Sequence, residues 1–385
     1  MPTYARADVA FERGEGAYLW STDGRRFLDF GSGVAVTSLG HCHPHLVSAL
    51  QAQAGKLWHT SNLYRVPGQE KVAAKLVANT FADTVFFCNS GAEANECAIK
   101  MARKYHYDSG NPEKVEIICA TGAFHGRTLG TIAAGGQEKH LKGFAPVMPG
   151  FVHVPFGNLN ELRAAITPQT AAILVEPVQG EGGVVAGDPD YLKRLRATAD
   201  EFGVLLIFDE VQTGMGRTGP LFAYEWTCVT PDIMPVAKGL GGGFPVGACL
   251  ATAAAAKGLS AGAHGSTFGG NPLAMAAADA VLDVMLEPGF LDGAKAMAAK
   301  LRQGVEAVCG QFPKVIEQVR GVGMLIGLKC LIPNTELQAK LMANGLLTVG
   351  AGDNVVRLLP PLIIRDAEIE EALDILTRTL SEVNK

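Results

Sequence analysis

The sequence lacks the features that would tie it to a membrane, to nucleic acid or to an oxidising compartment. Its most apolar stretches are interrupted by Gly, Asp or Pro well before the roughly 20 residues that a membrane span needs. The N-terminal MPTYARADVAFERGEG has no apolar core of a signal peptide, and no Lys/Arg cluster indicates a nucleic-acid or membrane surface. The eight cysteines form no C-x-x-C pair. This usage favours reduced, mostly buried thiols and a cytoplasmic location.

The composition is that of a large folded protein. The 385 residues are 48% hydrophobic and 18% charged, with a net charge of −5. A chain of this length and apolar content predicts two domains with substantial cores, and it argues against disorder. The 46 glycines gather in loops, which is typical of backbone that passes close to a ligand.

Two segments stand out, VLLIFDEVQTGMGRTG at residues 204–219 and VAKGLGGGFPVGA at residues 236–248. The apolar run 204–208 predicts a buried strand of a parallel sheet, and it ends at Asp209 and Glu210. A second apolar run, residues 233–237, leads to Lys238 and a glycine-rich turn. In open α/β sheets the ligand crevice lies outside the carboxyl ends of the strands. Asp209 and Lys238 are therefore candidate site residues.

A lysine and a buried carboxylate at neighbouring strand ends suit pyridoxal phosphate. The lysine forms a Schiff base with this cofactor, and the carboxylate keeps the ring nitrogen protonated so that the ring accepts electrons. Burial also makes the lysine easier to deprotonate. A plain ion pair at the strand ends explains these two residues equally well.

A third segment favours the cofactor. The strand predicted at residues 84–88 is followed by NSGAEAN, residues 89–95, and then by a helical pattern. A helix that begins in small residues offers free N–H groups and a positive dipole end to a phosphate. An ordinary capped helix is the alternative, but Asp209 and Lys238 favour the phosphate.

The stretches DEVQTGMGRTG and AKGLGGGFPVGA resemble those of the class III pyridoxal-phosphate aminotransferases of fold type I. The resemblance covers nearly the whole chain and is strongest to the bacterial acetylornithine aminotransferases. It implies an α/β fold with a large domain built on a mostly parallel, seven-stranded-type sheet and a smaller, discontinuous α/β domain. We expect residues 1–50 and 273–385 to form the small domain and residues 51–272 the large one. The resemblance also implies a homodimer with shared active sites.

The resemblance assigns roles to individual residues of this chain. The catalytic pair is Lys238 and Asp209. Residues expected to contact the cofactor are Ser90, Gly91, Ala92 and Thr267 at the phosphate, Phe124 and Val211 on the two ring faces, Gln212 at the phenolic oxygen, and Glu210 beside Asp209. Residues expected to contact the substrate are Arg127, Glu181, Ser266 and Arg357. Of these, Arg127 and Arg357 would bind carboxylates, and Glu181 would pair with Arg357 and swing away when an α-carboxylate arrives.

The expected reaction transfers the terminal amino group of N2-acetyl-L-ornithine to 2-oxoglutarate. It gives N-acetyl-L-glutamate 5-semialdehyde and L-glutamate, a step of arginine biosynthesis. Val34 aligns with a tyrosine of ornithine-specific relatives, and the smaller side chain would leave room for an acylated α-amine. Succinylornithine, succinyldiaminopimelate or another omega-amino acid fits the same space. An aminomutase or a non-enzymatic binding module are weaker alternatives.

Two other patterns argue for different sites and are set aside. His41, Cys42, His43 and His45 suggest a metal, but their spacing around a helix start at Pro44 would not direct them to one ion. Residues 214–219 fit G-x-G-x-x-G, yet they follow a loop and run into Pro220, whereas a nucleotide site needs them between a strand and a helix. An ATPase is excluded because the chain has no G-x-x-x-x-G-K-[ST]. We therefore expect no metal.

The remaining chain alternates strand and helix patterns, which predicts a sheet covered on both faces. Strands are expected in residues 10–30, 115–119, 171–175, 315–320, 323–329 and 355–359, and helices at 69–81, 191–202, 273–311 with a break at Gly289, 336–343 and 366–382.

Overall fold

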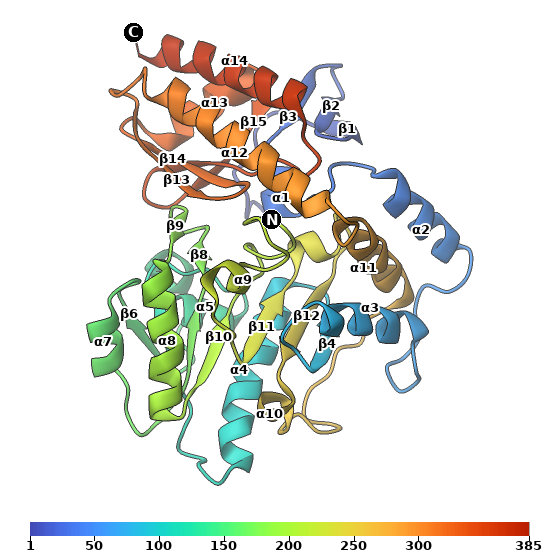
Figure 1. Ribbon diagram of the computed structural model, residues 1–385, viewed down its shortest axis with the longest axis vertical. Coiled ribbons are helices and arrows are strands. Elements are labelled where there is room, and N and C mark those ends of the chain that lie inside the picture. The colour runs from blue at the N-terminus through green and yellow to red at the C-terminus, as the bar shows by residue number, and fades with distance from the viewer. Residues whose placement is uncertain (385) are drawn as a thin grey trace.

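The computed structural model describes residues 1–384, and a seven-stranded sheet forms its centre (Figure 1). In order across the sheet, the strands are β4 (Thr84–Cys88), β12 (Gly247–Ala251), β11 (Ile233–Val236), β10 (Leu205–Phe208), β7 (Thr170–Val175), β5 (Glu116–Ala120) and β6 (Phe151–Val154). Only β12 runs against its neighbours, pairing antiparallel with both β11 and β4. The predicted mostly parallel sheet is confirmed.

Helices cover both faces of this sheet, which explains why its strands are continuously apolar. Side chains alternate between faces along each strand. Ile117 and Ile207 pack with α4 (Gly91–Asp108), whereas Ile118 and Leu206 pack with α8 (Pro189–Phe202). Every strand position in the centre of the sheet is therefore buried.

The N-terminal strands join the C-terminal third of the chain. The strands β1 (Phe11–Glu15), β2 (Tyr18–Ser21) and β3 (Arg26–Asp29) form a meander, and β3 pairs in parallel with β15 (Leu346–Leu347). The expected discontinuous small domain agrees with this pairing. Its exact boundaries stay a prediction, because α2 (Pro44–Ala54) packs on α11 (Pro272–Met285) across both proposed borders.

A second four-stranded sheet lies above the large one in Figure 1. Its order is β13 (Ile316–Val322), β14 (Leu325–Cys330), β17 (Val355–Leu358) and β16 (Val349–Ala351). The helices beside it are α12 (Phe290–Cys309), α13 (Asn334–Ala343) and α14 (Asp366–Val383). The remaining elements are α1 (Ser32–Ala35), α3 (Pro67–Ala78), α5 (Leu129–Gly135), α6 (Glu138–Leu141), α7 (Leu159–Ala164), β8 (Val178–Gln179), β9 (Val185–Ala186), α9 (Ala223–Thr227), the 3-10 turn η1 (Lys238–Leu240) and α10 (Ala253–Ala256). Within residues 1–384, no helix is both long and apolar enough to cross a membrane.

Candidate active site

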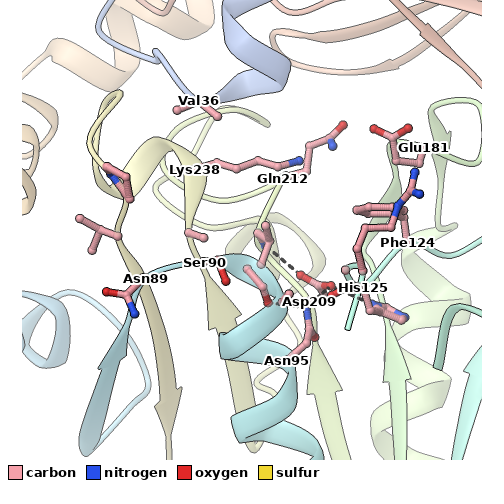
Figure 2. A pocket seen from close by; sticks show the side chains of 18 of the residues that line it. Val36, Asn89, Ser90, Asn95, Phe124, His125, Glu181, Asp209, Gln212 and Lys238 are labelled. Atoms are coloured by element: carbon pink, nitrogen blue, oxygen red, sulfur yellow. Dashed lines mark hydrogen bonds and ion pairs between the residues drawn. The ribbon is translucent and has the colours of Figure 1, made fainter. Parts of the chain in front are cut away.

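The candidate site is a cavity of about 440 Å³ at the carboxyl ends of the large sheet (Figure 2). This volume is within the range of about 300–1,000 Å³ that is usual for small-molecule sites. Much of its wall comes from residues that follow five strands: Asn89 to Ala92 after β4, Phe124 to Arg127 in the loop after β5, Glu176 after β7, Asp209 after β10, and Ala237 and Lys238 after β11. The position is the one that strand direction predicts.

Asp209 is fixed by three donors on the cavity floor. Its Oδ2 lies 2.8 Å from Asn95 Nδ2 and 2.7 Å from His125 Nδ1, and its Oδ1 accepts the Val211 N–H at 3.0 Å. Burial opposes a charge on His125, but the hydrogen bond and charge of Asp209 raise its pKa above the ordinary value. The carboxylate thus has one orientation and a neighbouring group that favours its negative charge.

Lys238 reaches across the cavity toward Gln212 (Figure 2). Burial lowers the pKa of its amine to about 8, with smaller opposing contributions from Glu181, Asp209 and Glu176. Its backbone is left-handed, with φ of +45°, a conformation that costs about 1–3 kcal/mol in a non-glycine residue and is common at active sites. Gly239 follows because a Cβ there would lie 2.8 Å from Ser38 Oγ.

The first turn of α4 forms a cradle for an anion. Ser90 caps the helix by accepting the Glu93 N–H at 3.2 Å, and Ser90, Gly91 and Ala92 all line the cavity. A Cβ on Gly91 would lie 2.6 Å from Val211 Cγ1. Glycine therefore allows the helix start to pack closely on Val211, which also lines the cavity. The free N–H groups of this first turn can bind a phosphate.

Phe124 and Arg127 form one wall. The Phe124 N–H donates to Glu176 Oε1 at 2.7 Å, and the Arg127 guanidinium carbon lies 5.5 Å from the centre of the Phe124 ring. Glu176 also accepts the Gly180 N–H at 3.3 Å. Burial raises the pKa of Glu176 to about 7. This carboxyl thus connects the Phe124 loop to the loop that carries Glu181.

The expected pair of Glu181 and Arg357 is present. Arg357 Nη2 lies 2.7 Å from Glu181 Oε1 and 2.9 Å from the Gly350 carbonyl, and Nη1 donates to Gln212 Oε1 at 3.0 Å. Only 1% of the Arg357 side chain is exposed, against 29% for Glu181. Glu181 and Gln212 line the cavity and Arg357 lies behind them. If the Glu181 side chain moved away, it would expose the Arg357 guanidinium, which Gln212 and the Gly350 carbonyl still hold in place.

Several expected site residues lie outside the cavity. The Glu210 carboxylate accepts the N–H groups of Ala223 and Tyr224 of α9 at 2.7 and 2.8 Å, and its expected contact with the cofactor stays a prediction. Ser266 lies beside the cavity, with its Oγ 3.3 Å from Asn89 Nδ2, and Thr267 is exposed. Val34 does not line the cavity either; Val36 does. The reason is the left-handed turn of α1, which includes Val34 at φ of +65°.

Two of the three histidines of residues 41–45, His41 and His45, have separate partners. His41 Nε2 lies 2.8 Å from Asp29 Oδ2, and His45 Nε2 lies 3.3 Å from Asp283 Oδ2. Burial lowers the pKa of His43. His41 and His45 thus contact carboxylates of two different elements, β3 and α11.

Sequence reasoning missed Asn95, His125, Glu176 and Val36. Three of these carried a usable signal, because Asn95 lies one helical turn after Gly91, His125 follows Phe124, and Glu176 directly follows the strand predicted at 171–175. Val36 carried no such signal, since its position depends on the left-handed turn before it.

Comparison with known proteins agrees with this geometry. The family described as Aminotransferase class-III matches residues 2–380. The acetylornithine aminotransferases of Brucella melitensis and Agrobacterium fabrum are each 60% identical over 371 residues, which cover 96% of this chain and 92% and 93% of those proteins.

Solved structures give the same result. The ornithine aminotransferase from Toxoplasma gondii has a TM-score of 0.95 at 34% identity, covering 100% of this chain and 92% of that one. The N-acetylornithine aminotransferase from Stenotrophomonas maltophilia has a TM-score of 0.87 at 38% identity, covering 99% and 97%. The expected fold type I architecture is confirmed, and the chain belongs to the class III aminotransferase family.

Proposed function

We propose that the cavity binds pyridoxal 5'-phosphate and that the chain is an aminotransferase acting on N2-acetyl-L-ornithine and 2-oxoglutarate. The observation that carries the proposal is the meeting of the Lys238 amine, the Asp209 carboxylate and the α4 cradle in one cavity. The residues fit this cofactor: Ser90, Gly91 and Ala92 bring the N-terminus of a helix to the cavity, and Asp209 offers a fixed acceptor to a protonated ring nitrogen. When bound, the cofactor supplies an electron sink for the pair released when a C–H bond breaks.

The protein's own residues then divide the work. Lys238, with its pKa lowered to about 8 by burial, acts as the base that takes a proton from the substrate carbon and would deliver it to the carbon of the cofactor that carries the amino group. Asp209, held by Asn95 and His125, keeps the ring nitrogen charged. Phe124 and Val211 line the cavity, where they would hold the ring between them and exclude water. Gln212 is placed to donate its Nε2 to the phenolic oxygen while its Oε1 holds Arg357.

Glu210 acts indirectly, through the backbone that it contacts. Its carboxylate holds the start of α9 through the N–H groups of Ala223 and Tyr224, and it adjoins Asp209 in the chain. We assign it a positioning role for the loop that follows β10.

The two substrates explain the Glu181–Arg357 pair. Acetylornithine presents a terminal amine with no carboxylate on the reacting carbon, whereas 2-oxoglutarate presents a carboxylate there. Glu181 covers Arg357 during the first half-reaction and leaves it free for the α-carboxylate in the second, and Arg127 binds the distant carboxylate. The names and 60% identity of the Brucella and Agrobacterium relatives support acetylornithine as the donor.

The acyl group is the least constrained part of this assignment. Succinylornithine, succinyldiaminopimelate and other omega-amino acids share the reacting end and differ only beyond it. Val36 lines the cavity with a small apolar side chain. An aminomutase would need no 2-oxoglutarate, so dependence on that acceptor excludes it.

We further propose that the protein is a cytoplasmic homodimer. In this dimer the loop of Ser266 and Thr267 contacts the phosphate of the cofactor that is bound by the partner subunit. The exposure of Thr267 and of neighbouring Phe268 supports the dimer, because 61% of this apolar side chain would otherwise face solvent. The eight unpaired cysteines support a reducing compartment.

Initial rates test the assignment directly. Acetylornithine, succinylornithine, ornithine and 4-aminobutyrate would each be supplied with 2-oxoglutarate, and glutamate formation would be measured. We expect the largest specificity constant for acetylornithine. A larger value for ornithine or 4-aminobutyrate would reject it as the donor, and glutamate formation from none of the four would reject the activity.

A further inference from the structure

The glycine-rich segment of residues 214–219 has a structural use that its nucleotide-like spacing does not suggest. It lies against the C-terminal part of the chain, at the seam between the seven-stranded sheet and the sheet of β13, β14, β17 and β16. A Cβ on Gly216 would lie 2.7 Å from Leu362 Cδ1, and a Cβ on Gly323 would lie 2.7 Å from the Thr218 carbonyl carbon. Both glycines have positive φ, +79° and +59°. The two backbones therefore approach more closely than any other residue type would allow.

Arg217 crosses this seam. Its side chain is 1% exposed, and Nη1 donates to the carbonyls of Met324 at 3.2 Å and Pro360 at 2.5 Å. The Met324 N–H returns a hydrogen bond to the Arg217 carbonyl at 2.9 Å. Among residues 1–384, no carboxylate forms an ion pair with this guanidinium, and burial lowers its pKa to about 10. A buried cation without a counter-ion is costly, so a purely space-filling role would be served better by an apolar residue.

The two carbonyls belong to the strand pair that carries Arg357. Met324 directly precedes β14 and Pro360 follows β17 by two residues. These strands pair antiparallel, with Gly327 opposite Arg357. Arg217 thus holds the adjoining ends of both strands with one guanidinium.

The residue after Arg217, Thr218, connects the glycine-rich segment to the candidate active site. Thr218 Oγ1 donates to the Thr213 carbonyl at 3.3 Å and accepts from Trp226 Nε1 at 3.2 Å. Thr213 immediately follows Gln212. A short, hydrogen-bonded path therefore runs from Gln212 through the glycine-rich loop to the strand of Arg357.

We propose that Arg217 is a positioning residue that fixes the strand of Arg357 against the loop of Asp209 and Gln212, and so sets the reach of Arg357 for the substrate α-carboxylate. The inference rests on the proposed function, in which only 2-oxoglutarate and glutamate use Arg357 directly. Directional bonds to carbonyls fix register as well as separation, which apolar packing alone does not. Loss of Arg217 should therefore affect the dicarboxylate half-reaction more than the acetylornithine half-reaction.

The test measures both half-reactions by single-turnover absorbance in Arg217→Met and Arg217→Lys, with wild-type protein in parallel. Since misplacing a binding group by about 1 Å can cost about a hundredfold, we expect Arg217→Met to lower the specificity constant for 2-oxoglutarate, relative to that for acetylornithine, by about tenfold to a hundredfold. Lysine can still donate to a carbonyl, so Arg217→Lys should recover part of the loss. Glutarate is a dicarboxylate that cannot react, so calorimetry can measure its binding alone. Its affinity should be highest for the wild type, lower for Arg217→Lys and lowest for Arg217→Met.

Arg302→Met is the matched control. Arg302 also donates to two carbonyls, those of Gly321 at 2.8 Å and Val319 at 3.5 Å, but it joins α12 to β13 without crossing the seam. Its ratio of specificity constants should equal that of the wild type. Gly323→Ala keeps the arginine but forces the two backbones apart. It should therefore give the same ratio of specificity constants as Arg217→Met. This second variant tests the proposal even if Arg217→Met does not fold.

The outcomes separate the two proposals. A wild-type protein inactive on acetylornithine rejects the proposed function. An active wild type in which Arg217→Met and Gly323→Ala lower both half-reactions equally, or leave the ratio unchanged, rejects the positioning role.

Discussion

Replacing Glu181 by alanine should change which amino acid the protein accepts. The carboxylate of Glu181 covers Nη2 of Arg357 at 2.7 Å. Without it, Arg357 stays in place because Gln212 Oε1 and the Gly350 carbonyl still hold it at 3.0 and 2.9 Å. The guanidinium is then open to an α-carboxylate from the start, and Glu181→Ala should favour glutamate over acetylornithine.

The size of the change follows from one charged hydrogen-bonded pair. Such a pair contributes about 1.5–3 kcal/mol, which corresponds to about tenfold to a hundredfold in the ratio of specificity constants. The upper part of this range applies only to an ion pair that is buried away from solvent. Arg357 is 1% exposed and Glu181 29% exposed, so solvent screens the interaction only in part.

The assay compares specificity constants for glutamate and acetylornithine, each measured as a single half-reaction. Glu201→Ala is the control, because Glu201 pairs with Arg163 at 2.8 Å on the surface and neither residue lines the cavity. Its ratio should match the wild type. Equal losses on both substrates in Glu181→Ala, or an unchanged ratio, would show that Glu181 does not gate Arg357.

Three further predictions concern the rest of the site. Asp209→Asn should retain the cofactor but slow the half-reaction strongly, since a neutral amide cannot hold the ring nitrogen charged; an unchanged stopped-flow rate would remove Asp209 from this role. Pyridoxal phosphate can react only with the neutral Lys238 amine. The rate at which the apo-protein takes up the cofactor should therefore rise with pH and level off above about pH 8. A rate that keeps rising up to the ordinary lysine pKa near 10.4 would contradict the effect of burial. Mixing inactive Lys238→Ala subunits with an inactive Thr267 variant should restore about one intact site per hybrid dimer, and verified hybrids without activity would argue against a shared site.

The sequence predicted the large sheet because its signals are local. Continuous apolar runs such as 204–208 need burial on both faces, and alternation of strands with helices supplies it. The helix expected at 69–81 begins at Pro67 and ends at Ala78, and the break expected at Gly289 separates α11 from α12. These small differences reflect proline at a helix start and a left-handed glycine at the cap.

The contacts that define the site were harder to predict because they join distant segments. His125 reaches Asp209 across 84 residues and Asn95 reaches it across 114. Their partners depend on which strands become neighbours. Val36 shows a different limit. The four residues before it, Ser32 to Ala35, have φ between +46° and +65°, and only Gly33 among them is a glycine. Such a turn is unfavourable for L-residues and is maintained by tertiary contacts, so local propensity argues against it.

The most direct test of the central claim is glutamate formation from acetylornithine and 2-oxoglutarate by wild-type protein and by Lys238→Ala, with Lys114→Ala as a surface-lysine control. The wild type and the control should turn over at equal rates, and Lys238→Ala should lose turnover, because the only amine that lines the cavity among the described residues is removed. Near-wild-type turnover in Lys238→Ala would contradict the account.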